Sequence, residues 1–192
     1  MISNKLIIQL IISIYIVFTI SLFFPIVNLG IVPRTLKGLI GIFTSPFLHS
    51  GFRHIISNTI PLVVLLFILS HFYPKKALSV ILFTVIAGGL LVWLFGRNAN
   101  HIGASGLIYG VAAFLIANGF IEKKFVPLLI SIGVIVLYKG LIWGILPSLQ
   151  SYISWESHLF GAITGVLISF FLKGNETLSY PNNRKRNKKI KK

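Results

Sequence analysis

The stretch HIGASGLIYG (residues 101–110) places Ser105 among three glycines in a run that is otherwise mostly apolar. Tyr109 follows four residues later, and residues four apart share one face of a helix. Polar side chains inside a membrane helix are costly unless a partner or a water-filled cavity receives them. The stretch therefore predicts an apolar helix whose first turns carry functional polar groups.

The composition is typical of a membrane protein, because 55% of the 192 residues are hydrophobic and only 11% are charged. Six apolar runs are each long enough, as helices, to cross a hydrocarbon core of ~30 Å. They are Leu6–Phe24, Ile55–Phe72, Ala77–Phe95, Ile102–Ile121, Phe125–Leu146 and Ile153–Leu172. The sequence thus predicts an all-α membrane protein with a six-transmembrane-helix bundle over residues 1–174. A basic, disordered cytoplasmic tail is expected over residues 175–192.

Three segments have features that affect how they are placed in the membrane. Lys5 precedes the first run, but that run exceeds the ~7–15 apolar residues of a signal peptide and lacks a small-x-small cleavage site. We therefore expect it to be retained. Lys139 interrupts the fifth run and must reach a headgroup region or face protein. The connection from Pro25 to Arg53 is too apolar for open water, so we expect it to lie in the interface or pack on the bundle.

The basic residues predict the orientation in the membrane. The formal charge is +15, and seven of the 18 Lys and Arg lie in the tail RKRNKKIKK. With six spans both termini share one side, which also receives six further lysines, against five Lys or Arg opposite. The positive-inside rule places both termini in the cytoplasm. We expect a multi-pass protein of a bacterial plasma membrane, with its tail on anionic headgroups and no nucleic-acid partner.

Polar groups converge at the predicted outer ends of the second, fourth and sixth runs. In this orientation all three runs begin at the outer face. His54 and Asn58 lie four apart at the start of the second run, Ser105 starts the fourth, and His158 starts the sixth. A hydroxyl, two imidazoles and an amide are therefore expected at similar depth.

Glycine pairs predict that the fourth and sixth helices touch. The pairs are Gly106 with Gly110, and Gly161 with Gly165. Small-xxx-small pairs let two helix backbones come into near contact. Contact through these faces would bring Ser105 within reach of His158. A serine nucleophile needs such a base, because its hydroxyl is weakly nucleophilic until the proton is removed.

The acidic residues favour a Ser–His dyad over a triad. The chain has no aspartate, and Glu122 and Glu176 fall on the predicted cytoplasmic side. Glu156 lies two residues before His158 and therefore on another helix face. We predict Ser105 and His158 as the dyad, with the Tyr109 ring supporting the histidine. Because the chain has no cysteine and no H-E-x-x-H segment, neither a thiolate site, a metal nor a cofactor is expected.

An acyl-transfer site also needs hydrogen-bond donors for the oxyanion. His54 and Asn58 can offer side-chain N–H groups. The backbone N–H of Ser105 is free if that residue lies in the first helical turn. Gly103 favours such a loop-to-helix approach.

Three short motifs that contain these residues resemble those of the rhomboid intramembrane serine proteases. They are H-x4-H-x3-N (His49, His54, Asn58), G-x-S-G (Gly103, Ala104, Ser105, Gly106) followed by Tyr109, and H-x2-G-x3-G (His158, Gly161, Gly165). The resemblance covers nearly the whole chain. Many family members carry a Trp-Arg pair in the first loop, whereas the comparable region here reads TLKGLIGIF.

The resemblance implies a six-helix bundle with a water-filled cavity that opens outward. It implies Ser105 as nucleophile and His158 as general base and acid. It further implies oxyanion contacts from His54, Asn58 and the Ser105 backbone, and cleavage of transmembrane protein substrates near their outer ends.

Other interpretations stay open from the sequence. A rhomboid-like pseudoprotease would bind or escort membrane proteins without cutting them, and a small transporter would also gather polar groups. Taken alone, Ser105 is a common packing residue at helix contacts. His49 is expected to tie down the first loop by hydrogen bonding. His101 is the weaker candidate for the base, and His71 is expected at the cytoplasmic interface.

Overall fold

The computed structural model describes residues 4–147 and 154–173, and its regular secondary structure over these ranges is helical apart from one isolated β-bridge. The elements are α1 (Asn4–Ser21), η1 (Ile26–Leu29), α2 (Leu36–Thr44), η2 (Ser45–Phe47), α3 (Phe52–Phe72), α4 (Ala77–Phe83), the π-turn η3 (Thr84–Gly88), α5 (Gly89–Phe95), α6 (Ser105–Glu122), α7 (Phe125–Tyr138), α8 (Leu141–Ile145) and α9 (Trp155–Phe171). The all-α prediction is confirmed for the described residues.

Four helices are long and apolar enough to cross a membrane: α1, α3, the continuous segment Ala77–Phe95, and α6. The fifth predicted run breaks after Tyr138 into α7, with 14 residues, and α8, with five. Lys139 is exposed at this break. The helix of the sixth run, α9, has 17 residues. The count of six spans therefore stays a prediction, as does the cytoplasmic side of the termini.

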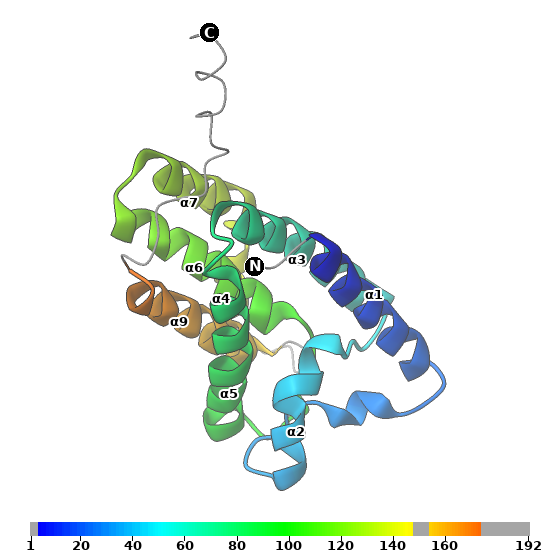
Figure 1. Cartoon of the computed structure of the whole chain (residues 1–192). Helices are drawn as coiled ribbons and strands as arrows, with labels where there is room; N and C mark the ends of the chain where they lie inside the picture. The colour runs from blue at the N-terminus through cyan, green and yellow to red at the C-terminus, as the bar shows by residue number, and fades with distance from the viewer. Residues whose placement is uncertain (1–3, 148–153, 174–192) are drawn as a thin grey trace, which may run out of the picture.

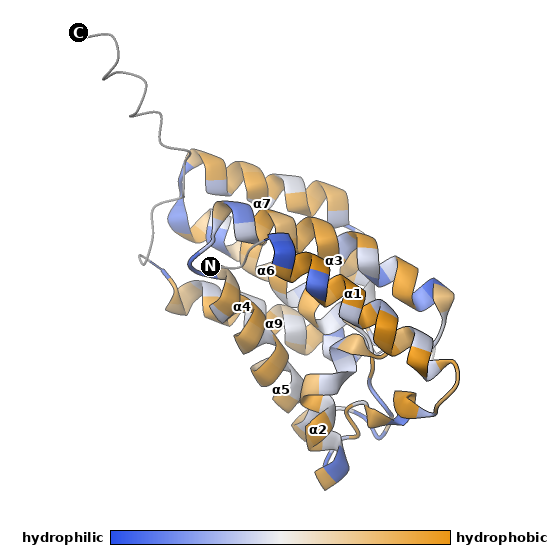
Figure 2. Cartoon of the chain, turned by 45° about the vertical axis from the view of Figure 1, so that its right-hand side comes forward, coloured by the Kyte–Doolittle hydropathy of each residue, from blue (hydrophilic) through white to orange (hydrophobic). Residues whose placement is uncertain are grey.

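Helix α6 is the centre of the bundle (Figure 1), and α3, α7 and α9 pack around it. In the membrane-length window of α6, 56% of the residues are buried, against 17% for α1. The peripheral helix α1 packs on α3. Hydrophobic residues cover α4, α5 and α7 along most of their length (Figure 2), which suits surfaces that face lipid.

Helices α6 and α9 meet backbone to backbone. A Cβ atom on Gly161 would overlap the carbonyl oxygen of Gly106, and one on Gly165 would overlap that of Gly110. The two predicted glycine pairs thus face each other. Gly110 also faces Thr84 of η3, so α6 is enclosed on this side as well.

The first loop packs on the bundle through α2. Gly41 of α2 touches the backbone of Gly30, and Ile42 lies against Gly89 of α5. Trp93 donates from Nε1 to the Thr35 carbonyl at 2.8 Å, and Arg34 donates from Nη1 to the Gly96 carbonyl at 2.9 Å. The first loop is therefore anchored by a tryptophan that belongs to α5, near its C-terminal end.

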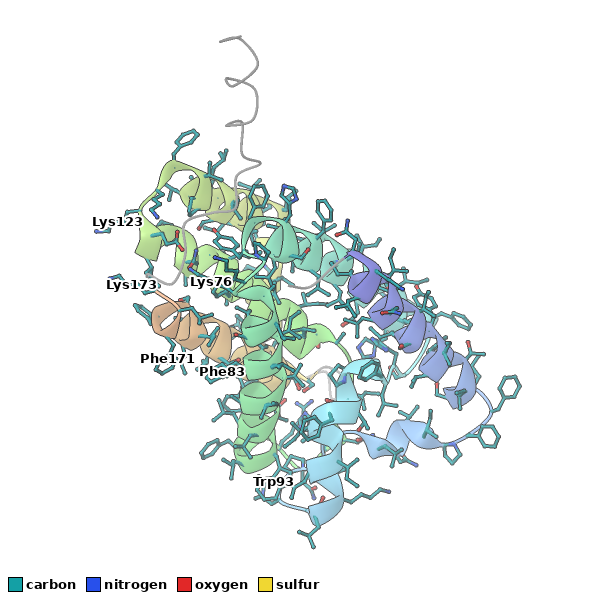
Figure 3. The ribbon with its side chains drawn as sticks, in the orientation of Figure 1. Lys76, Phe83, Trp93, Lys123, Phe171 and Lys173 are labelled. Atoms are coloured by element: carbon teal, nitrogen blue, oxygen red, sulfur yellow. The ribbon has the colours of Figure 1, made fainter. Side chains whose placement is uncertain are left out.

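Several lysines lie at the end of the bundle opposite the first loop (Figure 3). Lys76, Lys123 and Lys173 lie there, whereas Trp93 lies at the other end of the Ala77–Phe95 segment. Lys76 is buried, and its Nζ is 2.7 Å from Glu122 Oε1. This ion pair ties the start of α4 to the end of α6.

The α6–α9 contact can be tested with Gly165→Ala. The added Cβ would overlap the Gly110 carbonyl, and overpacking of this kind costs roughly 1–3 kcal/mol. We expect a lower Tm for the detergent-solubilised variant. The matched control is Gly133→Ala on α7, where the new methyl group would meet no described atom of another element within 4 Å. Equal Tm losses in both variants would contradict the close contact.

Candidate active site

The chain turns sharply into α6 just before Ser105. Gly103 has φ 111°, a backbone conformation that favours glycine, and its N–H donates to the Ser45 carbonyl at 2.9 Å. Helix α6 begins at Ser105, so the Ser105 backbone N–H is one of the four that lack an intrahelical acceptor. The serine therefore presents both a hydroxyl and a backbone donor at the helix start.

The His158 ring is held on one edge and one face. Its Nδ1 lies 2.8 Å from the carbonyl oxygen of Gly144. A carbonyl only accepts, so Nδ1 carries the proton, and Nε2 of the neutral ring keeps a lone pair. The ring stacks on Tyr109 with centroids 4.2 Å apart and planes 5° apart. The imidazole is thus oriented with a basic nitrogen available.

The His54 ring has the opposite tautomer. Its Nδ1 accepts from the Ser50 backbone N–H at 3.4 Å, so Nε2 of the neutral ring carries the proton. A Cβ on Gly103 would lie 2.6 Å from this Nε2. The donor edge of His54 therefore lies beside the approach to Ser105.

Asn58 lies one turn below His54 on α3. Its Nδ2 donates to the His54 carbonyl at 2.9 Å, which uses one of the two amide hydrogens. The side chain is buried, and its Oδ1 has no hydrogen-bond partner among the described residues. The second amide hydrogen is available for an oxyanion.

One cavity of about 550 Å³ joins these groups at the end of the bundle where α3, α6 and α9 begin. The polar groups predicted from the sequence that line it are His54, Asn58, Ser105, Tyr109 and His158. Arg53, Ser57 and Ser154 add further polar surface. A volume of this size can admit a segment of peptide together with water.

Three other histidines lie outside this cavity. His49 is buried, with its Nδ1 3.4 Å from the Phe47 carbonyl and its ring 4.9 Å from that of His54. His101 uses both ring nitrogens, on Ser154 Oγ at 2.7 Å and on the Arg97 carbonyl at 3.0 Å. His71 stacks on Phe67 near the end of α3. His101 therefore has no free nitrogen with which to activate Ser105.

The described carboxylates are engaged elsewhere. Glu156 is buried, and its Oε1 accepts from the Arg97 backbone N–H at 3.3 Å. Glu122 pairs with Lys76. Glu176 lies outside the described residues. Within those residues, no group of three or more His, Asp or Glu side chains is placed to hold a metal ion.

Sequence reasoning missed the backbone groups that orient the two rings. The Gly144 carbonyl and the Ser50 N–H carry no residue-specific signal, because every residue other than proline offers the same pair of groups. The break at Lys139 was visible as a charge in an apolar run, but not where the following turn would lie.

Comparison with known proteins gives the same family as these motifs. A model of the Rhomboid domain matches residues 37–175. An uncharacterized protein of Mycobacterium tuberculosis is 36% identical over 155 residues, which are 77% of this chain and 65% of that relative. RHOMBOID-like protein 1 of Arabidopsis thaliana is 27% identical over 149 residues, 74% of this chain and 37% of that protein. This chain therefore belongs to the rhomboid family of membrane proteins, and it spans less than two thirds of the length of these relatives.

Burial of His49 predicts a pH dependence of stability. Burial, and secondarily the nearby His54, lowers the pKa of His49 from 6.5 to about 4. Between these values the unfolded chain binds a proton that the folded protein does not. This histidine therefore makes the free energy of unfolding decrease as pH falls from 6.5 to 4.

The test compares Tm values of wild type and His49→Gln in detergent across this pH range. The variant lacks the ring, so we expect its Tm to decline less steeply with acidification. Parallel curves would show that His49 does not contribute to the dependence.

Proposed function

We propose that this chain is an intramembrane serine endopeptidase that uses a Ser105–His158 dyad. The observation that carries the proposal is that both residues line one cavity, with the His158 ring oriented so that Nε2 keeps its lone pair. The substrates are transmembrane proteins, cut near the outer boundary of their membrane helices. No cofactor takes part.

The proposed reaction has two stages. Ser105 Oγ attacks the peptide carbonyl carbon while Nε2 of His158 takes the hydroxyl proton. When the C–N bond breaks, Nε2 gives that proton to the leaving amine. Water then attacks the acyl-enzyme ester, with Nε2 again as base, and the serine is regenerated.

The oxyanion formed at each stage needs hydrogen-bond donors, and three N–H groups are available at or near Ser105. They are the Ser105 backbone N–H, Nε2–H of His54 and the second amide hydrogen of Asn58. His54 lies against Gly103, and Asn58 lines the same cavity. Gly103, Gly106, Gly161 and Gly165 support the site through the turn and the helix contact, and His49 supports it through the His54 ring.

For the membrane topology we propose six spans with both termini in the cytoplasm and α7 with α8 as the fifth. Support comes from the separation of the two ends of α6, because Ser105 starts at the cavity and Lys123 follows at the lysine-rich end. The cavity then opens toward the outside of a bacterial plasma membrane. The domain spans residues 1–174, and the tail, residues 175–192, contacts anionic headgroups rather than nucleic acid.

The dyad is tested by labelling with a fluorophosphonate probe. We expect wild type to react, Ser105→Ala not to react, and His158→Ala to react about 10²–10⁴-fold more slowly, since general-base catalysis contributes a factor of this size. Ser57→Ala is the matched control. Ser57 lines the same cavity, but its hydroxyl bonds to the His54 carbonyl, so labelling should match wild type.

Equal labelling of wild type and Ser105→Ala would remove the assignment. A folded wild-type protein that is neither labelled nor cleaves transmembrane substrates, but co-purifies with them, would favour the rhomboid-like pseudoprotease. That alternative binds or escorts membrane proteins without cleavage.

The role of Asn58 predicts a separate loss of rate. Asn58→Ala removes one oxyanion donor, which should lower kcat for a simple transmembrane substrate on the order of 10²–10³-fold. Tm and kcat are measured on the same preparation, with Ser57→Ala beside it. An unchanged kcat in a folded variant would exclude Asn58 from the oxyanion site.

A further inference from the structure

Near the end of the fifth apolar run, the Gly144 carbonyl has no donor within its own helix and lies at the proposed dyad. Helix α8 has only five residues, and Leu146 after it is extended, with ψ 141°. Pro147 follows and has no N–H to donate. The Gly144 carbonyl is therefore among the last four of its helix, which have no intrahelical donor. It is free to accept from a side chain.

That side chain is His158. The Nδ1–H of His158 donates to the Gly144 carbonyl at 2.8 Å. We infer that the Gly144 carbonyl is the positioning group of His158, an inference that rests on the proposed dyad. The carbonyl does the orienting work that a carboxylate does in a Ser–His–Asp triad. It selects the tautomer that leaves Nε2 basic, and its dipole stabilises the imidazolium formed when Ser105 loses its proton.

No described carboxylate competes for this position. Glu156 accepts from Arg97, and Glu122 pairs with Lys76. Tyr109 holds only the face of the imidazole, by stacking. Stacking fixes the plane of the ring, but a 180° turn about the Cβ–Cγ bond would keep that plane and exchange the positions of nitrogens and carbons. The bond from Nδ1 to Gly144 therefore decides which edge of the ring carries Nδ1 and which carries Nε2.

Glycine at position 144 leaves room for the side chains of Tyr109 and His158. A Cβ there would overlap the Tyr109 hydroxyl oxygen and would lie 3.0 Å from His158 Nδ1. The backbone therefore approaches both rings closely enough to place its carbonyl beside the imidazole. A larger residue must displace either α8 or the Tyr109 ring on which His158 stacks.

Helix α8 is part of the catalytic arrangement, because it supplies the carbonyl that positions His158. This helix has no buried residue, and Trp143 is 73% exposed. Of its side chains, Leu141 alone packs against the hydrophobic core, so little apolar packing fixes the rest of the helix to the bundle. A displacement of α8 would leave His158 Nδ1 without its acceptor, so the position of α8 and the basicity of Nε2 are coupled.

The principal test measures kcat and KM of Gly144→Ala with a simple transmembrane substrate. We expect kcat to fall about 10–100-fold, because small displacements of catalytic groups cost rate of this order, with KM within about twofold. Gly140→Ala is the matched control, since this glycine precedes α8 and a methyl group on it would reach no described atom of another element within 4 Å. It should retain wild-type kcat. An unchanged kcat in Gly144→Ala overturns the inference.

Tyr109→Phe tests the mechanism of that loss. The added methyl overlaps the Tyr109 hydroxyl, so Gly144→Ala should cost kcat less in a Tyr109→Phe background than in wild type. An equal cost in both backgrounds would contradict displacement by this overlap.

A spectroscopic measurement separates orientation from general damage and needs no altered α8. In wild type labelled with ¹⁵N-histidine, the His158 signal is identified by its loss in His158→Gln. We expect the Nδ1-protonated tautomer, whereas an Nε2-protonated ring overturns the inference. The proposed protease activity is tested independently: if wild type is neither labelled by fluorophosphonate nor active, that proposal fails even where the tautomer is as expected.

Discussion

The backbone contact between α6 and α9 is the constraint on which the site depends. Gly161 and Gly165 have no side chains, so α9 rests directly on the carbonyls of α6. Each helix then carries its polar residue at the same end, Ser105 on α6 and His158 on α9. Larger residues would separate the helices by the width of a side chain, and a hydroxyl would no longer share a cavity with an imidazole.

The two histidines of the cavity carry their protons on different ring nitrogens, because different backbone groups contact them. An N–H group approaches Nδ1 of His54 and a carbonyl approaches Nδ1 of His158, so the two Nε2 atoms differ in protonation. One ring offers a donor and the other offers a lone pair. The proposed acyl transfer uses one of each, since the nucleophile must lose a proton while the carbonyl oxygen gains negative charge.

Outside the cavity, buried polar groups hold the ends of the helices. Glu156 and His101 connect the approach to α6 with the start of α9, and Lys76 with Glu122 connects the start of α4 with the end of α6. Arg34 anchors the first loop to the end of α5.

From the sequence alone, residue types and helical spacing determined the all-helical membrane fold and the candidates Ser105 and His158, and the resemblance of three short motifs indicated the family. They also placed Tyr109 one turn from the serine, where its ring stacks on the histidine. Only the tertiary structure decided the break in the fifth run, the engagement of His101 and the partner of His158 Nδ1. The physical reason is that each residue type has its own side-chain chemistry, whereas every residue has the same backbone carbonyl. The role of the Gly144 carbonyl therefore depends only on where the fold places it.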